Sequence, residues 1–123
     1  ITLNNFESAF KPETRLCIVT AVSNVFGDIL PLKELSEIAH SKGASFFVDG
    51  AQGAGVVTLD MKKQGIDCLC IPGHKGLLGP MGTGALLHKN LPFKSLFQGG
   101  TGTSSFKYAF FASFKASFMK KIS

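Results

Sequence analysis

Three short runs of apolar residues constrain this chain more than any other feature: residues 16–22 (LCIVTAV), 44–50 (ASFFVDG) and 66–72 (IDCLCIP). Each is rich in β-branched or aromatic side chains and apolar at consecutive positions, which is typical of a strand buried on both faces. Between the first two, residues 31–43 begin at a proline, place leucines at helical spacing and end at a glycine. That pattern predicts an amphipathic helix.

Shorter patterns complete the predicted fold. Leu3, Phe6 and Phe10 share one face of a short helix near the start of the chain. Residues 59–65 (LDMKKQG) predict a helical turn, and residues 84–89 (GALLHK) predict a fourth strand. We therefore expect an α/β fold, with a mostly parallel sheet that flanking helices cover on both faces.

Length and composition fit one globular domain, because 45% of the 123 residues are hydrophobic and 17% are charged. The sequence begins without a methionine or a targeting segment, so we expect it to be a piece of a longer protein. No apolar run approaches the roughly 18 residues that cross a bilayer. We expect a cytoplasmic protein without membrane attachment.

The net charge of +5 gives little support to nucleic-acid binding. Residues 106–123 contain four lysines and no acid, and without those lysines a net charge of about +1 remains. No helix-turn-helix or RNA-binding signature accompanies the charge. We expect no nucleic-acid partner.

The three cysteines, Cys17, Cys68 and Cys70, lie within the apolar runs. Their odd number and their positions favour reduced thiols in the core over a disulfide framework. Two cysteines two positions apart, with no further Cys or His close by, do not match a zinc site. The sequence predicts no metal site.

Polar residues follow each apolar run. Asn24 comes after the first run, Asp49 and Gln52 after the second, and His74 and Lys75 after the third. The carboxyl ends of parallel strands meet at one edge of a sheet, where ligands bind. We therefore expect these side chains to converge.

Each of these residues also has a plain structural interpretation. Asp49 can cap the turn that follows it, or it can bind a ring nitrogen while Gln52 donates to an oxygen of the same flat ligand. Lys75 can be a surface ammonium, or a partly desolvated amine that attacks a carbonyl. His74 can be packed or exposed, or it can donate to an anion. The glycines of residues 76–84 (GLLGPMGTG) fit no nucleotide-binding order and favour turns.

In order and spacing, residues 22–31 (VSNVFGDILP), 46–61 (FFVDGAQGAGVVTLDM) and 65–86 (GIDCLCIPGHKGLLGPMGTGAL) resemble the class V aminotransferase-like enzymes that depend on pyridoxal phosphate. This group contains the cysteine desulfurases and selenocysteine lyases. The resemblance implies that residues 1–105 are the central part of the large, cofactor-binding domain of a fold type I enzyme. Residues 106–123, rich in Phe, Lys and Ser, depart from it. For them we favour a frameshifted or artificially ended tail over a membrane-surface helix.

The resemblance also implies a role for each polar residue. Lys75 holds pyridoxal 5'-phosphate as an internal aldimine and moves protons during catalysis. Asp49 pairs with the pyridine nitrogen, and Gln52 donates to the phenolic oxygen of the ring. Asn24 lies close to that oxygen and to the substrate carboxylate, and His74 contacts the phosphate.

The implied activity is the removal of sulfur or selenium from an amino acid, with cysteine as the first choice of substrate. The alternatives are class V aminotransferase activity in the longer protein and a chain that is non-catalytic as it stands. A homodimer and a sulfur-acceptor protein are the implied partners. Pro72 departs from the family, because many desulfurases have a serine there whose hydroxyl reaches the phosphate. None of the three cysteines matches the position of the sulfur-accepting cysteine.

Overall fold

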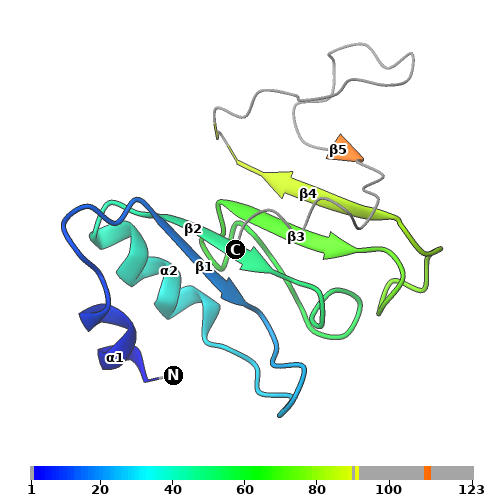
Figure 1. Ribbon diagram of the computed structural model, residues 1–123, viewed down its shortest axis with the longest axis horizontal. Helices are drawn as coiled ribbons and strands as arrows, with labels where there is room; N and C mark the ends of the chain where they lie inside the picture. The colour runs from blue at the N-terminus through cyan, green and yellow to red at the C-terminus, as the bar shows by residue number, and fades with distance from the viewer. Residues whose placement is uncertain (1, 90, 92–109, 112–123) are drawn as a thin grey trace.

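A sheet flanked by helices forms the body of the protein in the computed structural model, which describes residues 2–89, 91 and 110–111 (Figure 1). In chain order the elements are α1 (Leu3–Ser8), β1 (Leu16–Thr20), α2 (Leu32–Ser41), β2 (Ser45–Asp49), β3 (Cys68–Pro72), β4 (Gly84–His88) and β5 (Phe110–Phe111). The α/β class, both helices and all four predicted strands are confirmed. The predicted tail at residues 106–123 lies outside the described residues, apart from the two that form β5.

The strands lie side by side in chain order. β1, β2 and β3 run parallel, with Thr20 opposite Asp49 and Asp49 opposite Cys70. β4 is antiparallel to β3, and β5 is antiparallel to β4. The prediction of a mostly parallel sheet is therefore confirmed, and the reversal of direction comes after β3.

The core lies between α2 and one face of the sheet. α2 begins after Pro31 and ends before Gly43, whose φ of 75° is a conformation that glycine adopts without strain. Its buried side chains include Leu35, which is 1% exposed, and they face β-strand residues such as Phe46, which is 0% exposed. Burial of apolar side chains of this size stabilises the fold by about 1.5–3 kcal/mol each.

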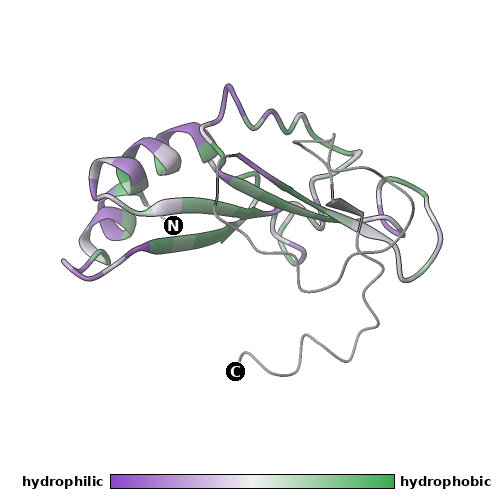
Figure 2. Ribbon diagram, turned by 90° about the horizontal axis from the view of Figure 1, so that it is seen from above, coloured by the Kyte–Doolittle hydropathy of each residue, from purple (hydrophilic) through white to green (hydrophobic). Residues whose placement is uncertain are grey.

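The opposite face of the sheet is not covered by a helix of the described residues. Figure 2 shows both helices on the same side of the strands. On the other side Leu16 is 47% exposed and Ile18 is 65% exposed, whereas Val19, between α2 and the sheet, is buried. The prediction that helices cover both faces is therefore wrong for this part of the chain. The strands are apolar on both faces, and the described helices cover one.

α1 packs against α2 at the edge of the core. Phe6 and Phe10 meet edge to face, with ring centroids 5.2 Å apart. Lys42, just after α2, forms a 2.8 Å ion pair with Glu7 of α1. The Phe6 and Phe10 rings thus pack against the core from the α1 side, and a surface charge pair links α1 to the end of α2.

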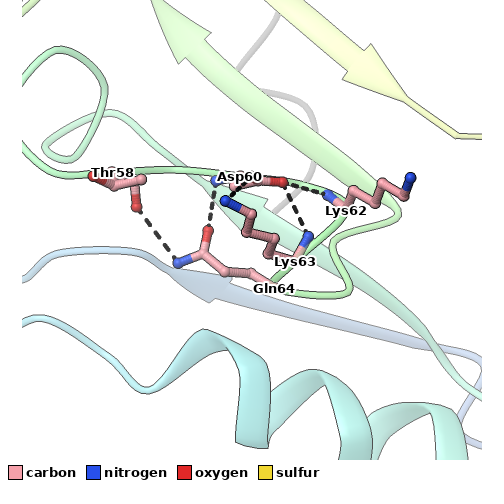
Figure 3. Close-up of polar contacts among 5 residues, drawn as sticks. All are labelled: Thr58, Asp60, Lys62, Lys63 and Gln64. Carbon is pink, nitrogen blue, oxygen red and sulfur yellow. Dashed lines mark hydrogen bonds and ion pairs between the residues drawn. The ribbon is translucent and has the colours of Figure 1, made fainter.

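A hydrogen-bonded turn joins β2 to β3 where a helical turn was predicted (Figure 3). Asp60 Oδ1 accepts from the backbone N–H groups of Lys62 and Lys63, each at 3.0 Å. In return the backbone N–H of Asp60 donates to Gln64 Oε1 at 2.8 Å. This reciprocal arrangement resembles the capping of a helix N-terminus.

The three cysteines are free, but they are not all in the core. Cys68 is buried, Cys17 is half-buried and Cys70 is exposed. The prediction of core thiols is wrong for Cys70, which is exposed although it shares a face of the sheet with the buried Cys68. Within the part of the chain that the structure describes, no helix has the length and apolar character to span a membrane.

Candidate functional site

The segments that carry the predicted site residues all leave one edge of the sheet. β1, β2 and β3 are parallel, so their carboxyl ends lie together (Figure 1). The pairing continues one residue past the strands, because Ala21 N–H donates to Asp49 O and Gly50 N–H donates to Cys70 O, both at 2.8 Å. The loops that follow β1, β2 and β3 therefore begin side by side.

Asn24 lies in a compact loop after β1. The Ser23 hydroxyl accepts from the backbone N–H groups of Val25 and Phe26, at 3.3 and 3.1 Å. The Ser23 N–H donates to Asp28 O at 2.9 Å, which closes the loop. Asn24 itself is exposed. The backbone thus fixes the position of Asn24 and leaves its amide available for a ligand.

Asp49 is the last residue of β2 and is exposed. Its Oδ1 accepts from the backbone N–H of Ala51 at 2.8 Å, so the turn-capping interpretation is correct. Among the described residues Oδ2 has no hydrogen-bond partner, and it leaves an acceptor free at the edge of the sheet. One carboxylate can therefore cap the turn and bind a ligand.

Gln52 lies in the turn that Asp49 caps. Gly53 and Ala54 both donate their N–H groups to Gly50 O, at 3.0 and 2.9 Å. A Cβ on Gly53 would lie 3.2 Å from the Cβ of Ala21, so this turn packs closely against the end of β1. Gln52 is half-buried there, between the loops after β1 and β3.

Two glycines bring the loop after β2 against the loop after β3. A Cβ on Gly55 would collide with the carbonyl oxygen of Gly76, and a Cβ on Gly76 would collide with that of Ala54. Gly55 also has a φ of 78°. This contact between backbones places the segment of Asp49 and Gln52 beside the segment of Lys75.

Lys75 and His74 lie in the loop that joins β3 to β4. Gly73 N–H donates to Thr83 O, and Gly79 N–H donates to Gly73 O, both at 2.7 Å. These bonds close the loop, and both His74 and Lys75 are exposed on it. Of the two alternatives for Lys75, the described residues show the exposed side chain and not the partly desolvated one.

The five predicted residues thus stand on three adjacent loops at one edge, and this edge is open. A hollow of about 450 Å³ lies at the opposite edge, lined among others by His40, Asp67 and Lys89. A second, of about 220 Å³, is lined by apolar residues of β3, β4 and the loops beside them. None of the five lines either hollow. The described residues contain no group of three or more side chains suited to a metal ion.

Sequence reasoning missed the glycine pair that joins two of the loops. Gly76 was among the glycines expected to form turns, and its contact with Gly55 depends on a pairing of distant segments that no local pattern indicates. It also missed the pairing of Asp49 with Cys70. The sequence does indicate that Cys68 and Cys70 share one face of the sheet, because side chains alternate along a strand. It does not indicate which residue of β2 lies opposite them.

An α/β fold with polar residues at the carboxyl ends of its parallel strands is typical of a ligand-binding enzyme domain. Comparison with known proteins gives the family. Residues 1–119 match the family model of the class-V aminotransferases, and the chain belongs to that family. The family depends on pyridoxal phosphate.

Among individual proteins, the chain is 46% identical over 80 residues to a probable cysteine desulfurase of Methanothermobacter thermautotrophicus, covering 65% of this chain and 20% of that protein. It is similar to the apo structure of the cysteine desulfurase from Thermococcus onnurineus NA1, with a TM-score of 0.64, 41% identity and coverage of 70% of this chain and 21% of that one. The cysteine desulfurase CsdA of Escherichia coli gives a TM-score of 0.66 at 34% identity, covering 71% and 22%. The chain spans about a fifth of the length of the curated relatives that it matches.

Proposed function

We propose that this chain is the cofactor-binding centre of a pyridoxal-phosphate enzyme that removes sulfur from cysteine. The observation that carries the proposal is the convergence of the Asp49 and Lys75 loops at the carboxyl edge of the parallel strands, through the contact of Gly55 with Gly76. The choice of cysteine is supported by the relatives, which are named cysteine desulfurases, and by the similar protein SspA, solved in complex with cysteine at 31% identity.

The donor and acceptor groups at this edge fit the cofactor. The exposed Lys75 amine can hold an aldehyde covalently. The Oδ2 atom of Asp49 is an acceptor for a protonated ring nitrogen, while Oδ1 stays on the backbone of Ala51. The close approach of Gly55 and Gly76 shapes a bend that any side chain at either position would fill. We therefore expect the edge to take a flat, aromatic, anionic ligand.

Each residue then has a defined task. Bound pyridoxal phosphate supplies an electron sink for the charge that develops on the substrate carbon. Asp49 keeps the proton on the ring nitrogen, since an anion there stabilises the pyridinium. Lys75 would hold the aldehyde of the cofactor and would move a proton at the substrate carbon.

The remaining side chains orient the ligands. Gln52 donates to the phenolic oxygen, His74 donates to the phosphate, and Asn24 binds near the substrate carboxylate. Pro72 offers no N–H or hydroxyl at the position where a serine donor would help to bind the phosphate. In this chain we assign that part of the phosphate binding to His74.

Two observations favour a second proposal, that the chain alone does not turn over cysteine. Four of the five side chains are exposed, and the chain spans about a fifth of its relatives. A site so open leaves the charged groups in water, where electrostatic stabilisation is weak. We propose that the walls of the site, including those from a second copy in a homodimer, and the thiol that passes sulfur to an acceptor protein belong to the longer protein.

Cofactor binding is tested on the chain itself. Pyridoxal phosphate is added, the product is reduced with borohydride, and the modified lysines are identified by mass spectrometry. We expect Lys75 to be labelled several-fold more than Lys63, whose side chain is 85% exposed and serves as the control for non-specific reaction. In the Asp49→Ala chain this preference should fall. Equal labelling of the two lysines in the folded chain would contradict cofactor binding by this segment.

Activity is tested with sulfide release from cysteine. The chain alone should release none, whereas an enzyme extended to the length of its relatives should release sulfide, and its Lys75→Ala variant should not. The extended enzyme could instead become labelled at Lys75 but transfer the amino group of its substrate and release no sulfide. That result would support the cofactor site and contradict the choice of reaction. That outcome would favour aminotransferase activity.

A further inference from the structure

Thr83 holds the neck of the loop that carries Lys75, and the proposed function gives it no task. The loop joins β3 to β4 and runs over residues 73–83 (Figure 1). At its neck Gly73 N–H donates to the carbonyl oxygen of Thr83 at 2.7 Å. The Thr83 hydroxyl donates to Pro80 O, also at 2.7 Å. Within the described residues, this hydroxyl is the only side-chain group that forms a hydrogen bond inside the loop.

We propose that Thr83 is a positioning residue for Lys75. Its hydroxyl keeps the neck of the loop closed, and the closed loop directs the Lys75 amine to the ligand. The inference rests on the function proposed above and adds one residue to its site. Thr83 acts through the backbone of the loop and not on the reacting atoms.

Two hydrogen bonds carry the effect of the hydroxyl to the start of the loop. The hydroxyl holds the carbonyl group of Pro80, and the residue before it, Gly79, donates its N–H to Gly73 O at 2.7 Å. Lys75 follows Gly73 by two positions in the chain. A shift of Pro80 would therefore also shift the backbone from which Lys75 projects.

The turn after Lys75 is strained, so it needs such support. Leu78 has a φ of 56°, a left-handed conformation that is unfavourable for a residue with a side chain. Its N–H donates to Lys75 O at 2.9 Å. Its side chain is 92% exposed, so packing of the leucine itself does little to hold the turn. A strained backbone persists only where the structure around it fixes it. Here the closed neck of the loop does so.

The fit at the neck is close. A Cβ on Gly73 would collide with the Thr83 hydroxyl oxygen, and a Cβ on Gly79 would lie 2.9 Å from Gly73 O. The hydroxyl therefore lies directly against the backbone that leads into Lys75. Loss of the hydroxyl leaves Pro80 O without its partner at this point.

Two substitutions separate the hydroxyl from the rest of the side chain. Thr83→Val keeps the shape and removes the hydroxyl, whereas Thr83→Ser keeps the hydroxyl and removes a methyl group. Thr58→Val is the matched control, because Thr58 is exposed in another loop and its carbonyl oxygen, which valine keeps, accepts the hydrogen bond from Gln64. Urea unfolding establishes that each chain is folded under the conditions of the tests.

The first measurement is independent of the cofactor. Hydrogen exchange of the Gly73 and Gly79 N–H groups, followed by NMR, reports whether the neck is closed. In Thr83→Val we expect both groups to exchange roughly two- to tenfold faster than in the wild-type chain, the effect of losing one hydrogen bond. In Thr83→Ser and Thr58→Val the rates should stay within about twofold of the wild type. Unchanged exchange in Thr83→Val would overturn the inference.

The second measurement is the labelling of Lys75 relative to Lys63 with pyridoxal phosphate and borohydride. Thr83→Val should lower this ratio by roughly two- to tenfold, whereas Thr83→Ser and Thr58→Val should keep it. A wild-type chain without a preference for Lys75 would contradict the proposed function, and this inference with it. A wild-type chain with the preference would isolate the inference. There, a Thr83→Val chain that keeps the preference, even with faster exchange, or a Thr83→Ser chain that loses it, would overturn the role of the hydroxyl alone.

Discussion

Asp49 combines an observed turn cap and a proposed role in cofactor binding in a single carboxylate, and substitution can separate the two. Oδ1 caps the turn through Ala51 N–H, and the charge is what the proposed ring nitrogen requires. Asp49→Asn keeps an oxygen acceptor for the turn and removes the charge. Asp49→Ala removes both.

We therefore predict that Asp49→Ala lowers the free energy of unfolding by about 0.5–1.5 kcal/mol, the usual worth of one such hydrogen bond. Asp49→Asn should lower it by less than about 0.5 kcal/mol, yet reduce the preferential labelling of Lys75 as much as Asp49→Ala does. Urea unfolding and the labelling experiment measure the two effects. Asn24→Ala, in an exposed loop, is the stability control, with an expected change within about 0.5 kcal/mol. Equal destabilisation by Asn and Ala at position 49 would contradict the separation.

Gly55 allows a second test at the level of one residue. Gly55 and Gly27 have φ angles of 78° and 75°, but a Cβ on Gly55 would collide with Gly76 whereas a Cβ on Gly27 would meet nothing within 4 Å. Alanine at either position carries the same backbone strain, about 1–2 kcal/mol. We predict that Gly55→Ala destabilises the chain by about 1–3 kcal/mol more than Gly27→Ala, the typical penalty of overpacking. If urea unfolding gives equal losses of unfolding free energy for the two variants, the close contact of the two loops does not stabilise the chain.

At the scale of elements, the turn between β2 and β3 should make stability depend on pH. Hydrogen bonds from the backbone of Lys63 and Lys62, and the nearby Lys63 ammonium, lower the pKa of Asp60 below its ordinary 3.8, while the slight loss of hydration opposes them. A pKa that folding lowers means that the ionised form stabilises the folded state above pH 3.8. That contribution is lost as the pH falls through the folded-state pKa.

We predict that Asp60→Asn is less stable than the wild-type chain at pH 7, and that the difference shrinks as the pH falls below 3.8. Thermal unfolding across this range measures it. Lys62→Ala is the matched control and should change little, because Asp60 accepts from the backbone N–H of residue 62, which alanine keeps. A difference independent of pH would contradict the assigned role of the carboxylate.

The elements themselves were largely predictable from the sequence. The proline and glycine that bound α2 and the apolar runs of β1, β2 and β3 are local signals, and each produced the element expected of it. The direction of β4 was not predictable, because GALLH is equally suited to a parallel or an antiparallel strand. The site was predictable to the extent that strand ends converge in a parallel sheet. The contact of Gly55 with Gly76 and the exposure of Lys75 depend on how distant segments pack, and no spacing in the sequence reports that.

At the scale of the whole molecule, the uncovered face of the sheet is the main departure from the predicted fold. Ile18 on β1 is 65% exposed and Val48 on β2 is 1% exposed, although both lie in apolar strands. The sequence alone could not distinguish them, because a strand that is apolar throughout predicts burial on both sides. A sheet face without a covering helix among the described residues is consistent with a chain that spans about a fifth of the length of its relatives.

We predict that Ile18→Thr changes the free energy of unfolding by less than about 0.5 kcal/mol and increases the solubility of the chain, since it removes apolar surface from an exposed face. Val48→Thr, the matched substitution on the covered face, should cost about 1–3 kcal/mol, because it buries a hydroxyl. Urea unfolding and light scattering measure these effects. A large loss of stability at Ile18 would mean that another part of the chain covers this face.

The reversal of direction after β3 also bears on the order in which the site assembles during folding. β3 and β4 are joined only by the loop that carries Lys75, so their antiparallel pairing closes a short stretch of chain. The parallel pairings of β1 with β2 and of β2 with β3 each close a longer segment, and the first must also fold α2. Pairings between nearby segments form sooner than those between distant ones. The loop of Lys75 is therefore expected to form early, and the loops of Asn24 and Asp49 to dock on it afterwards.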